Sequence, residues 1–116
     1  MNKEYRIKKT SEIDCVFSKK KSKGNELFVI YQSDCTENHF RYAISIGKKY
    51  GGSVSRNLAK RRIRHIVAAN KDNILNKLFV IVVKKEASKV DFQVMKTKIE
   101  EVLIKSNIME KKDEKK

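Results

Sequence analysis

The sequence predicts an α+β fold in which a small mixed β-sheet packs against three helices. Apolar residues recur with the period of strands in some segments and with the period of helices in others. The resulting order along the chain is helix, strand, strand, helix, strand, helix. With 116 residues, 40% of them apolar, the chain has the size of one folded domain. We therefore expect one domain over residues 1–108 and a basic, disordered tail over residues 109–116.

The first helix is expected from Ser11 to about Lys20. Ser11 precedes Asp14 by three residues, a spacing that resembles a capping box. The apolar residues of this segment share one helical face and are Ile13, Val16 and Phe17. Four lysines then form a basic turn that ends at Gly24, namely Lys19, Lys20, Lys21 and Lys23.

Three segments have the pattern of strands. Residues 26–33 are apolar on both faces, which suits a central strand. Residues 40–46 alternate, and a polar loop over residues 34–39 joins them to the first strand, so the two are expected to form an antiparallel hairpin. Residues 78–83 are six consecutive apolar residues, which predicts a third strand buried on both faces.

Two further helices complete the predicted fold. The second helix is expected to begin at Ser53, as its N-cap, and to end near Asn70. Its apolar positions point toward the sheet and are Ala59, Ile63, Ile66 and Val67. The opposite side gathers Ser53, Asn57, Lys60, Arg61 and Arg64. The last helix, residues 91–104, is amphipathic, and its inner face consists of Phe92, Met95, Ile99, Val102 and Leu103.

The charge of the chain points to a polyanionic partner. Lys and Arg number 28 against 14 Asp and Glu, a net charge of +14. Residues 38–71 contain nine of these cations and no acidic residue. This segment therefore has no ion pairs of its own, and its charge must be met by solvent, counterions or a partner's phosphates. An ordinary solvated face is the alternative, but such faces usually mix charges of both signs.

The start of the second helix has features that suit a phosphate backbone. Gly51 and Gly52 permit close approach of a ligand, and a helix N-terminus offers unpaired amides and a positive dipole end. Arginines in the following turns supply planar forks for phosphate. We expect Arg62 to lie at the core boundary with its guanidinium reaching solvent. The predicted RNA contacts are Lys48, Lys49, Gly51, Gly52, Arg56, Asn57, Lys60, Arg61, Arg62 and Arg64.

Other classes of protein fit less well. The longest apolar run has six residues, whereas a membrane-spanning helix needs about 20. The charged N-terminus lacks the apolar segment of a secretory signal, so a cytoplasmic location is expected. Cys15 and Cys35 match neither a disulfide framework nor a zinc motif and are expected to be reduced thiols. A nuclease acting by itself would need clustered carboxylates for its metal ions, and the basic segment has none.

Residues 45–64 closely resemble the signature block of the bacterial ribonuclease P protein component. They contain its Lys-Lys-x-Gly turn, at Lys48 to Gly51, and the Arg-Asn start of its Arg-Asn-Arg helix, at Arg56 and Asn57. The resemblance extends along nearly the whole chain, through residues 6–9, Val16, Phe17, residues 28–31 and Arg41.

The resemblance implies the protein subunit of a ribonucleoprotein that removes the 5′ leader from precursor tRNA. The expected partners are the RNase P RNA subunit, which would hold the catalytic magnesium ions, and precursor tRNA. No catalytic residue, metal site or cofactor is expected on the protein, and the protein alone is expected to be inactive. The implied fold resembles domain 2 of ribosomal protein S5, with a left-handed βαβ crossover, although about 98% of such crossovers are right-handed.

The resemblance also implies a cleft for the single-stranded leader, built by the first helix and the sheet. The residues expected there are Ile13, Phe17, Tyr31, Lys19, Lys20 and Lys21. The alternative is that both aromatic rings belong to the core. Leu58 departs from the third position of the Arg-Asn-Arg motif, which makes Arg62 a candidate substitute. A generic RNA-binding or ribosomal protein without a role in tRNA processing is the alternative reading of the charge.

Overall fold

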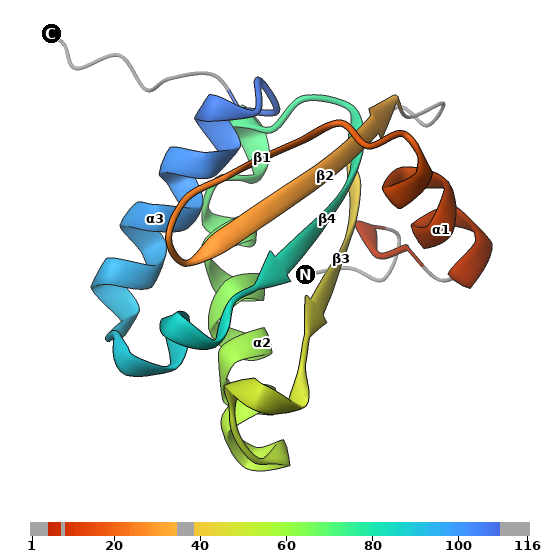
Figure 1. Cartoon of the computed structure of the whole chain (residues 1–116). Helices are drawn as coiled ribbons and strands as arrows, with labels where there is room; N and C mark the ends of the chain where they lie inside the picture. Colours follow the sequence, from red (N-terminus) through yellow and green to blue (C-terminus); the bar gives the residue numbers. More distant parts are fainter. Residues whose placement is uncertain (1–4, 8, 35–38, 110–116) are drawn as a thin grey trace, which may run out of the picture.

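A computed structural model describes residues 5–7, 9–34 and 39–109, and it confirms the α+β class (Figure 1). The described part contains a four-stranded sheet, three α-helices and short 3-10 helices labelled η. In chain order the elements are α1 (Thr10–Ser18), β1 (Ser22–Gly24), β2 (Phe28–Asp34), β3 (Arg41–Ile46), η2 (Lys48–Tyr50), α2 (Ser53–Ala69), η3 (Lys71–Asn73), β4 (Lys77–Val83), η4 (Lys85–Lys89) and α3 (Phe92–Lys105).

The strand order is β1-β2-β4-β3, so the predicted hairpin of β2 with β3 is wrong. β4 lies between them, antiparallel to β2 and parallel to β3. The reason is the composition of β4, whose residues 78–83 are all apolar. A central position gives such a strand neighbours on both edges and cover on both faces, so it buries more apolar surface there than at an edge.

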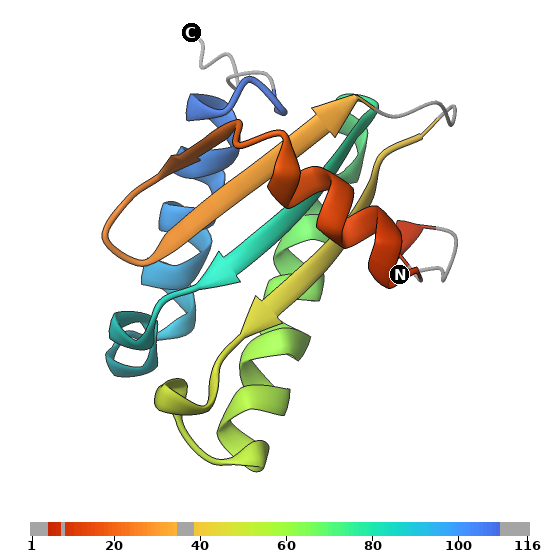
Figure 2. The same ribbon diagram turned by 45° about the vertical axis from the view of Figure 1, so that its right-hand side comes forward.

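The connection from β3 through α2 to β4 is left-handed. β3 and β4 are parallel neighbours, and α2 lies on the face of the sheet opposite to α1 (Figure 2). Viewed from the α1 side with both strands pointing up, β3 lies to the left of β4 and the chain passes behind the sheet between them. This is the rare hand that the resemblance implied, against the general preference.

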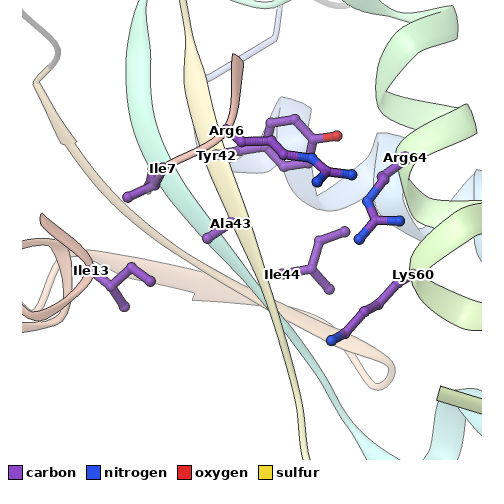
Figure 3. A pocket seen from close by; sticks show the side chains of 8 residues that line it. All are labelled: Arg6, Ile7, Ile13, Tyr42, Ala43, Ile44, Lys60 and Arg64. Atoms are coloured by element: carbon purple, nitrogen blue, oxygen red, sulfur yellow. The ribbon is translucent and has the colours of Figure 1, made fainter. Parts of the chain in front are cut away.

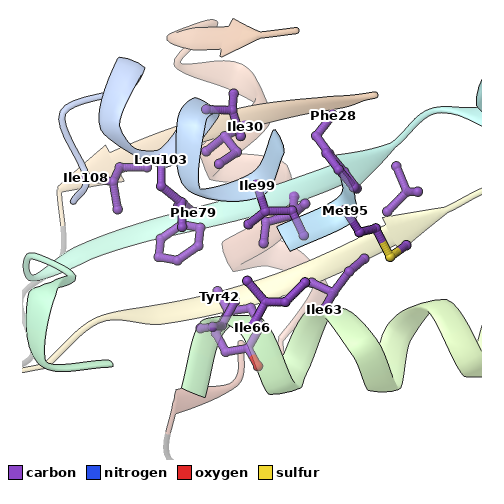
Figure 4. Close-up of a cluster of buried hydrophobic side chains, with 14 of the residues drawn as sticks. Phe28, Ile30, Tyr42, Ile63, Ile66, Phe79, Met95, Ile99, Leu103 and Ile108 are labelled. Atoms are coloured by element: carbon purple, nitrogen blue, oxygen red, sulfur yellow. The ribbon is translucent and has the colours of Figure 1, made fainter. Parts of the chain in front are cut away.

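The two faces of the sheet are covered unequally. The main core lies between the sheet and the helices α2 and α3 (Figure 4). Its largest fully buried side chains are Tyr42, Phe28, Phe79, Ile30, Ile63, Ile66, Ile81, Met95, Ile99, Leu103 and Ile108. The other face is crossed by α1 alone, and the cluster there has three buried residues, Ile7, Val16 and Val80. Part of the α1 face therefore stays accessible.

The ends of several elements differ from the predictions. Lys9 is the N-cap of α1 and Gly52 is the N-cap of α2, neither with a side-chain cap hydrogen bond. Ser11 and Ser53 have already entered their helices, where a serine no longer has the extended backbone of a cap. α3 starts one residue later than predicted, and Asp91 is its N-cap, whose side chain accepts a hydrogen bond from the Val94 amide.

Two segments belong to the fold that the predictions left outside it. Residues 22–24 form β1, which pairs with β2, where a turn was predicted. Met109 was assigned to the tail, yet it is buried and forms a bridge with Ile74. The rest of the predicted tail, residues 110–116, lies outside the described residues. Within the described ranges, no helix is both long enough and apolar enough to cross a membrane.

Candidate nucleic-acid interface

Helix α2 presents one packed side and one basic side, as the sequence predicts. The four predicted inner residues, Ala59, Ile63, Ile66 and Val67, are buried. Asn57 and Arg61 are exposed, while Lys60 and Arg64 are half-buried at the edge of the sheet next to β3. The polar side of α2 is therefore accessible to a partner over several turns.

A basic hollow of about 250 Å³ lies between α2, β3 and the segment before α1 (Figure 3). Among the described residues, its charged lining consists of Arg6, Lys60 and Arg64, with no acidic residue. Arg6 is held there because residues 6 and 42 form a bridge and the Ile7 amide donates a hydrogen bond to the Tyr42 carbonyl at 2.9 Å. Sequence reasoning missed Arg6 because it lies far from the basic segment along the chain.

Tyr42 contributes an unusual group to this hollow. The residue is 2% exposed, yet its hydroxyl has no hydrogen-bond partner within the described part of the chain. In Figure 3 the hydroxyl and the guanidinium groups of Arg6 and Arg64 point toward one another. Burial raises the pKa of Tyr42, so the hydroxyl keeps its proton and can donate it in a hydrogen bond. Two guanidinium groups, an ammonium group and a hydroxyl donor form a site suited to phosphate.

Arg62 lies on another side of α2 from Lys60 and Arg64. It is half-buried, as expected for the core boundary, and lines a smaller hollow of about 140 Å³ between η2, α2 and η4. Leu58, the departure from the family motif, lines the same hollow. Leu58 and Arg62 therefore line the same hollow. That Arg62 takes over the role of the arginine missing at position 58 stays a prediction.

The turn before α2 exposes the N-terminus of the helix. Lys48 and Lys49 are exposed in η2. Gly51 has a φ of 159°, and a Cβ there would lie 3.2 Å from the Cβ of Ser55, so a side chain would crowd the first turn. A Cβ on Gly52 would meet no atom within 4 Å. A side chain at position 51 would therefore meet both a tight contact and an unfavourable φ, whereas position 52 has room for a side chain.

Arg56, in the first turns of α2, is only partly available for binding. Its Nε is buried and has no hydrogen-bond partner among the described residues. The residue as a whole is half-buried.

The α1 face of the sheet carries the predicted aromatic pair. The rings of Phe17 and Tyr31 meet edge to face, with centroids 4.8 Å apart and an angle of 70° between their planes. Both side chains are half-buried, and so is Ile13. They pack against the small apolar cluster under α1 but stay partly exposed. The alternative that both rings belong to the core therefore holds only in part.

An ion pair holds α1 over the edge of the sheet. Arg41 donates two hydrogen bonds to the carboxylate of Glu12, at 2.7 and 3.1 Å. These bonds keep the pKa of Glu12 below its ordinary value. One cation of the basic segment is therefore paired within the fold, contrary to the expectation that a partner or solvent would meet its whole charge. Lys71 is also engaged, because its ammonium lies 4.8 Å from the ring centre of Tyr5.

Comparisons with known proteins agree with this geometry. The Ribonuclease P family matches residues 1–107. The ribonuclease P protein component of Acholeplasma laidlawii is 47% identical over 113 residues, which cover 96% of this chain and 97% of that protein. The corresponding protein of Streptococcus pyogenes serotype M5 is 35% identical, with 96% of this chain and 93% of that protein covered.

Solved structures give the same result. The RNase P protein of Staphylococcus aureus has a TM-score of 0.87 and 32% identity, with 90% of this chain and 97% of that chain covered. The protein from Thermotoga maritima has a TM-score of 0.80 and 28% identity, with 86% and 96% covered. The sequence match, the fold and the basic surface thus agree: the chain belongs to the ribonuclease P protein family, as a protein component of a ribonuclease that processes tRNA.

Proposed function

We propose that this chain binds the RNA subunit of ribonuclease P through the basic side of α2 and binds the 5′ leader of precursor tRNA on the α1 face of the sheet. It thereby assists the removal of the leader. The observation that carries the first part is the hollow at Tyr42, where Arg6, Lys60 and Arg64 converge and where no acidic residue of the described ranges joins them. In free protein these charges repel one another, and a phosphate between them would relieve that repulsion.

The second part rests on the accessible aromatic pair. Bases of single-stranded RNA stack on aromatic rings without sequence preference, and each contributes roughly 1 to 3 kcal/mol. Phe17 and Tyr31 offer such a surface, which suits leaders that differ in sequence. Ile13 beside them adds apolar contact but no ring.

The chemistry of cleavage is proposed to lie with the RNA subunit and its magnesium ions. The described part of the chain holds no group of three or more His, Cys, Asp or Glu side chains that could bind a metal ion. The protein would instead neutralise phosphates and position the substrate. The protein freed of RNA should therefore not cleave precursor tRNA, and magnesium-dependent cleavage that a single Asp or Glu substitution abolishes would refute this assignment.

The test of the RNA-subunit contact uses two variants, one that removes a charge and one that removes the buried hydroxyl. Arg64→Gln should weaken binding to the RNA subunit and reduce the slope of log affinity against log salt by about one. Tyr42→Phe removes a buried hydroxyl that lacks a partner, so free protein should become more stable by about 1 kcal/mol while RNA affinity falls. If both variants bind the RNA with unchanged affinity and slope, the contact lies elsewhere.

The effect of the leader on affinity distinguishes the proposed function from the alternative, a generic RNA-binding protein. The reconstituted holoenzyme should bind precursor tRNA more tightly than mature tRNA, and this gain should require the protein. A protein that binds RNA equally well without stimulating leader removal would support the alternative.

A further inference from the structure

A group of aromatic rings lies where the segment before α1 meets the start of β3 and the end of α2. The Tyr5 ring contacts the rings of His39 and Phe40, whose centroids are 4.7 and 4.9 Å away, respectively. Phe40 is 2% exposed and belongs to the main core, whereas Tyr5 and His39 are half-buried. Tyr5 and His39 therefore form an aromatic patch at the surface, and this patch rests on a buried ring.

A lysine shows which part of the Tyr5 ring reaches the surface. Lys71, in η3, is exposed, and its ammonium lies over the Tyr5 ring, 4.8 Å from the ring centre. The ring face beneath the ammonium therefore borders solvent. A lysine is held only weakly at an exposed ring, so a stacking base can take its place there.

The aromatic patch continues the basic hollow at Tyr42. Tyr5 directly precedes Arg6, which the bridge to Tyr42 holds in that hollow beside Arg64. Lys71 comes seven residues after Arg64, just past the end of α2. Because β3 is the last strand of the sheet, rings and cations lie side by side along its outer edge.

This combination of groups fits single-stranded nucleic acid. Unpaired bases stack on aromatic rings whatever their sequence, while lysines and arginines contact the neighbouring phosphates. Residues 38–71, which supply His39, Arg64 and Lys71, contain no acidic residue that would repel a phosphate. The patch therefore has the charge and the ring surface that a nucleotide chain requires.

A cover for the buried Phe40 ring is the alternative role of Tyr5. An aliphatic side chain of similar size would cover Phe40 as well, whereas stacking with a base requires an aromatic ring. Replacement of the ring by an aliphatic side chain therefore separates the two roles.

We propose that the exposed face of Tyr5 stacks an unpaired base of the RNA subunit, next to the phosphate that the hollow at Tyr42 binds. His39 supports the Tyr5 ring from the side. Lys71 covers the ring in the free protein and moves to a neighbouring phosphate when the base takes its place. This rests on the proposed function, because it extends the contact between α2 and the RNA subunit.

The first test measures the affinity of the protein for the RNA subunit alone, without tRNA, over a range of salt concentrations. Tyr5→Leu should weaken binding about five- to fiftyfold. Its slope of log affinity against log salt should not change, because a stacking contact releases no counterions. Tyr5→Phe is the control for the ring and should retain most of the affinity.

Lys71→Gln should have a different signature. It should weaken binding only about two- to fivefold and should lower the salt slope by about 0.7, the value for one phosphate of a single strand. Lys23→Gln is the matched control, because Lys23 is exposed in β1, at the opposite edge of the sheet. Circular dichroism and urea unfolding verify that every variant is folded.

A fluorescence measurement provides an answer even if Tyr5→Leu destabilises the fold. The chain contains no tryptophan, so Tyr5→Trp places a single tryptophan in the patch. A base stacked on it should quench its emission when the RNA subunit is added. Tyr31→Trp, on the α1 face, is the matched control, and its emission should stay unchanged with the RNA subunit alone.

Three results would overturn the proposal. If Tyr5→Leu keeps its affinity and Tyr5→Trp is not quenched, while Arg64→Gln still weakens binding, Tyr5 only covers the core and the proposed contact of α2 with the RNA stands. If Lys23→Gln matches Lys71→Gln in affinity and slope, Lys71 contributes only general charge. If Arg64→Gln also leaves binding unchanged, the proposed contact with the RNA subunit is wrong, and the stacking site with it.

Discussion

The two faces of the single sheet differ in how they use apolar surface. The face toward α2 and α3 carries most of the buried side chains, and β2 and β4 alternate so that Phe28, Ile30, Phe79 and Ile81 all point there. The α1 face carries three buried residues and leaves Tyr31 and its neighbours half-buried. The single helix α1 covers less of its sheet face than α2 and α3 together cover of theirs. The difference indicates that most of the stabilising apolar burial lies on the α2 and α3 face, whereas the α1 face stays partly accessible.

The largest expected effect tests the packed face. Phe79→Ala should lower the free energy of unfolding by about 3 to 5 kcal/mol, because it removes a fully buried ring and leaves a cavity. Tyr31→Ala, on the other face, should cost only about 1 kcal/mol. Urea unfolding of both variants measures the contrast, and equal losses would show that the two faces stabilise the fold alike.

The next effect tests the accessible face. Tyr31→Ala should reduce the leader-dependent binding energy of the holoenzyme by roughly 1 to 3 kcal/mol, since a stacking surface is lost. Tyr31→Phe is its control and should retain most of the gain, because the ring remains. A leader gain that survives Tyr31→Ala in a folded variant would assign the ring to structure.

A smaller effect concerns the attachment of α1 to the sheet. The Glu12 pKa is lower in the folded protein than in the unfolded chain, so its contribution to stability is present above the ordinary carboxyl pKa and is lost as the pH falls through the folded value. The Glu12→Gln variant should therefore have a free energy of unfolding about 0.5 to 1 kcal/mol lower than that of the unaltered protein at neutral pH. In acid the two free energies of unfolding should be equal. Unfolding curves at several pH values test this, and a deficit that is constant with pH would contradict it.

The smallest effect lies where α1 ends. Lys20 has a positive φ, which a residue with a Cβ adopts at a cost and glycine adopts freely. Lys20→Gly should therefore raise the free energy of unfolding by roughly 0.5 kcal/mol. This gain is smaller than the strain energy that is relieved, because glycine also increases the conformational entropy of the unfolded chain. Lys20→Ala should show no such gain, and a gain in both would point to charge instead.

The sequence predicted the faces of elements better than their partners. The inner side of α2 follows from helical spacing alone, and all four expected residues are buried. The neighbour of β2 could not be found in this way, because β3 and β4 both have suitable patterns and only the competition for the centre of the sheet decides between them. β1 was missed since Ser22–Gly24 contains no apolar side chain.

The candidate sites follow the same division. The basic side of α2 follows from the residue pattern of one segment, whereas the pair of Phe17 and Tyr31 was expected from the family resemblance. Arg6 joins Lys60 and Arg64 only through the bridge to Tyr42. Glu12 meets Arg41 from 29 positions away. Such contacts depend on the topology, which the residue pattern did not determine.

The central position of β4 also constrains how the chain acquires its structure during synthesis. β2 and β3 have no sheet partner in common until residues 77–83 emerge from the ribosome, so the first two thirds of the chain present unpaired strand edges. The final pairing closes loops of dozens of residues, which slows folding relative to a protein of local hairpins. A nascent chain halted before β4 would be an unfolded polycation, and it would meet RNA in that state before it had a surface with which to select among RNAs.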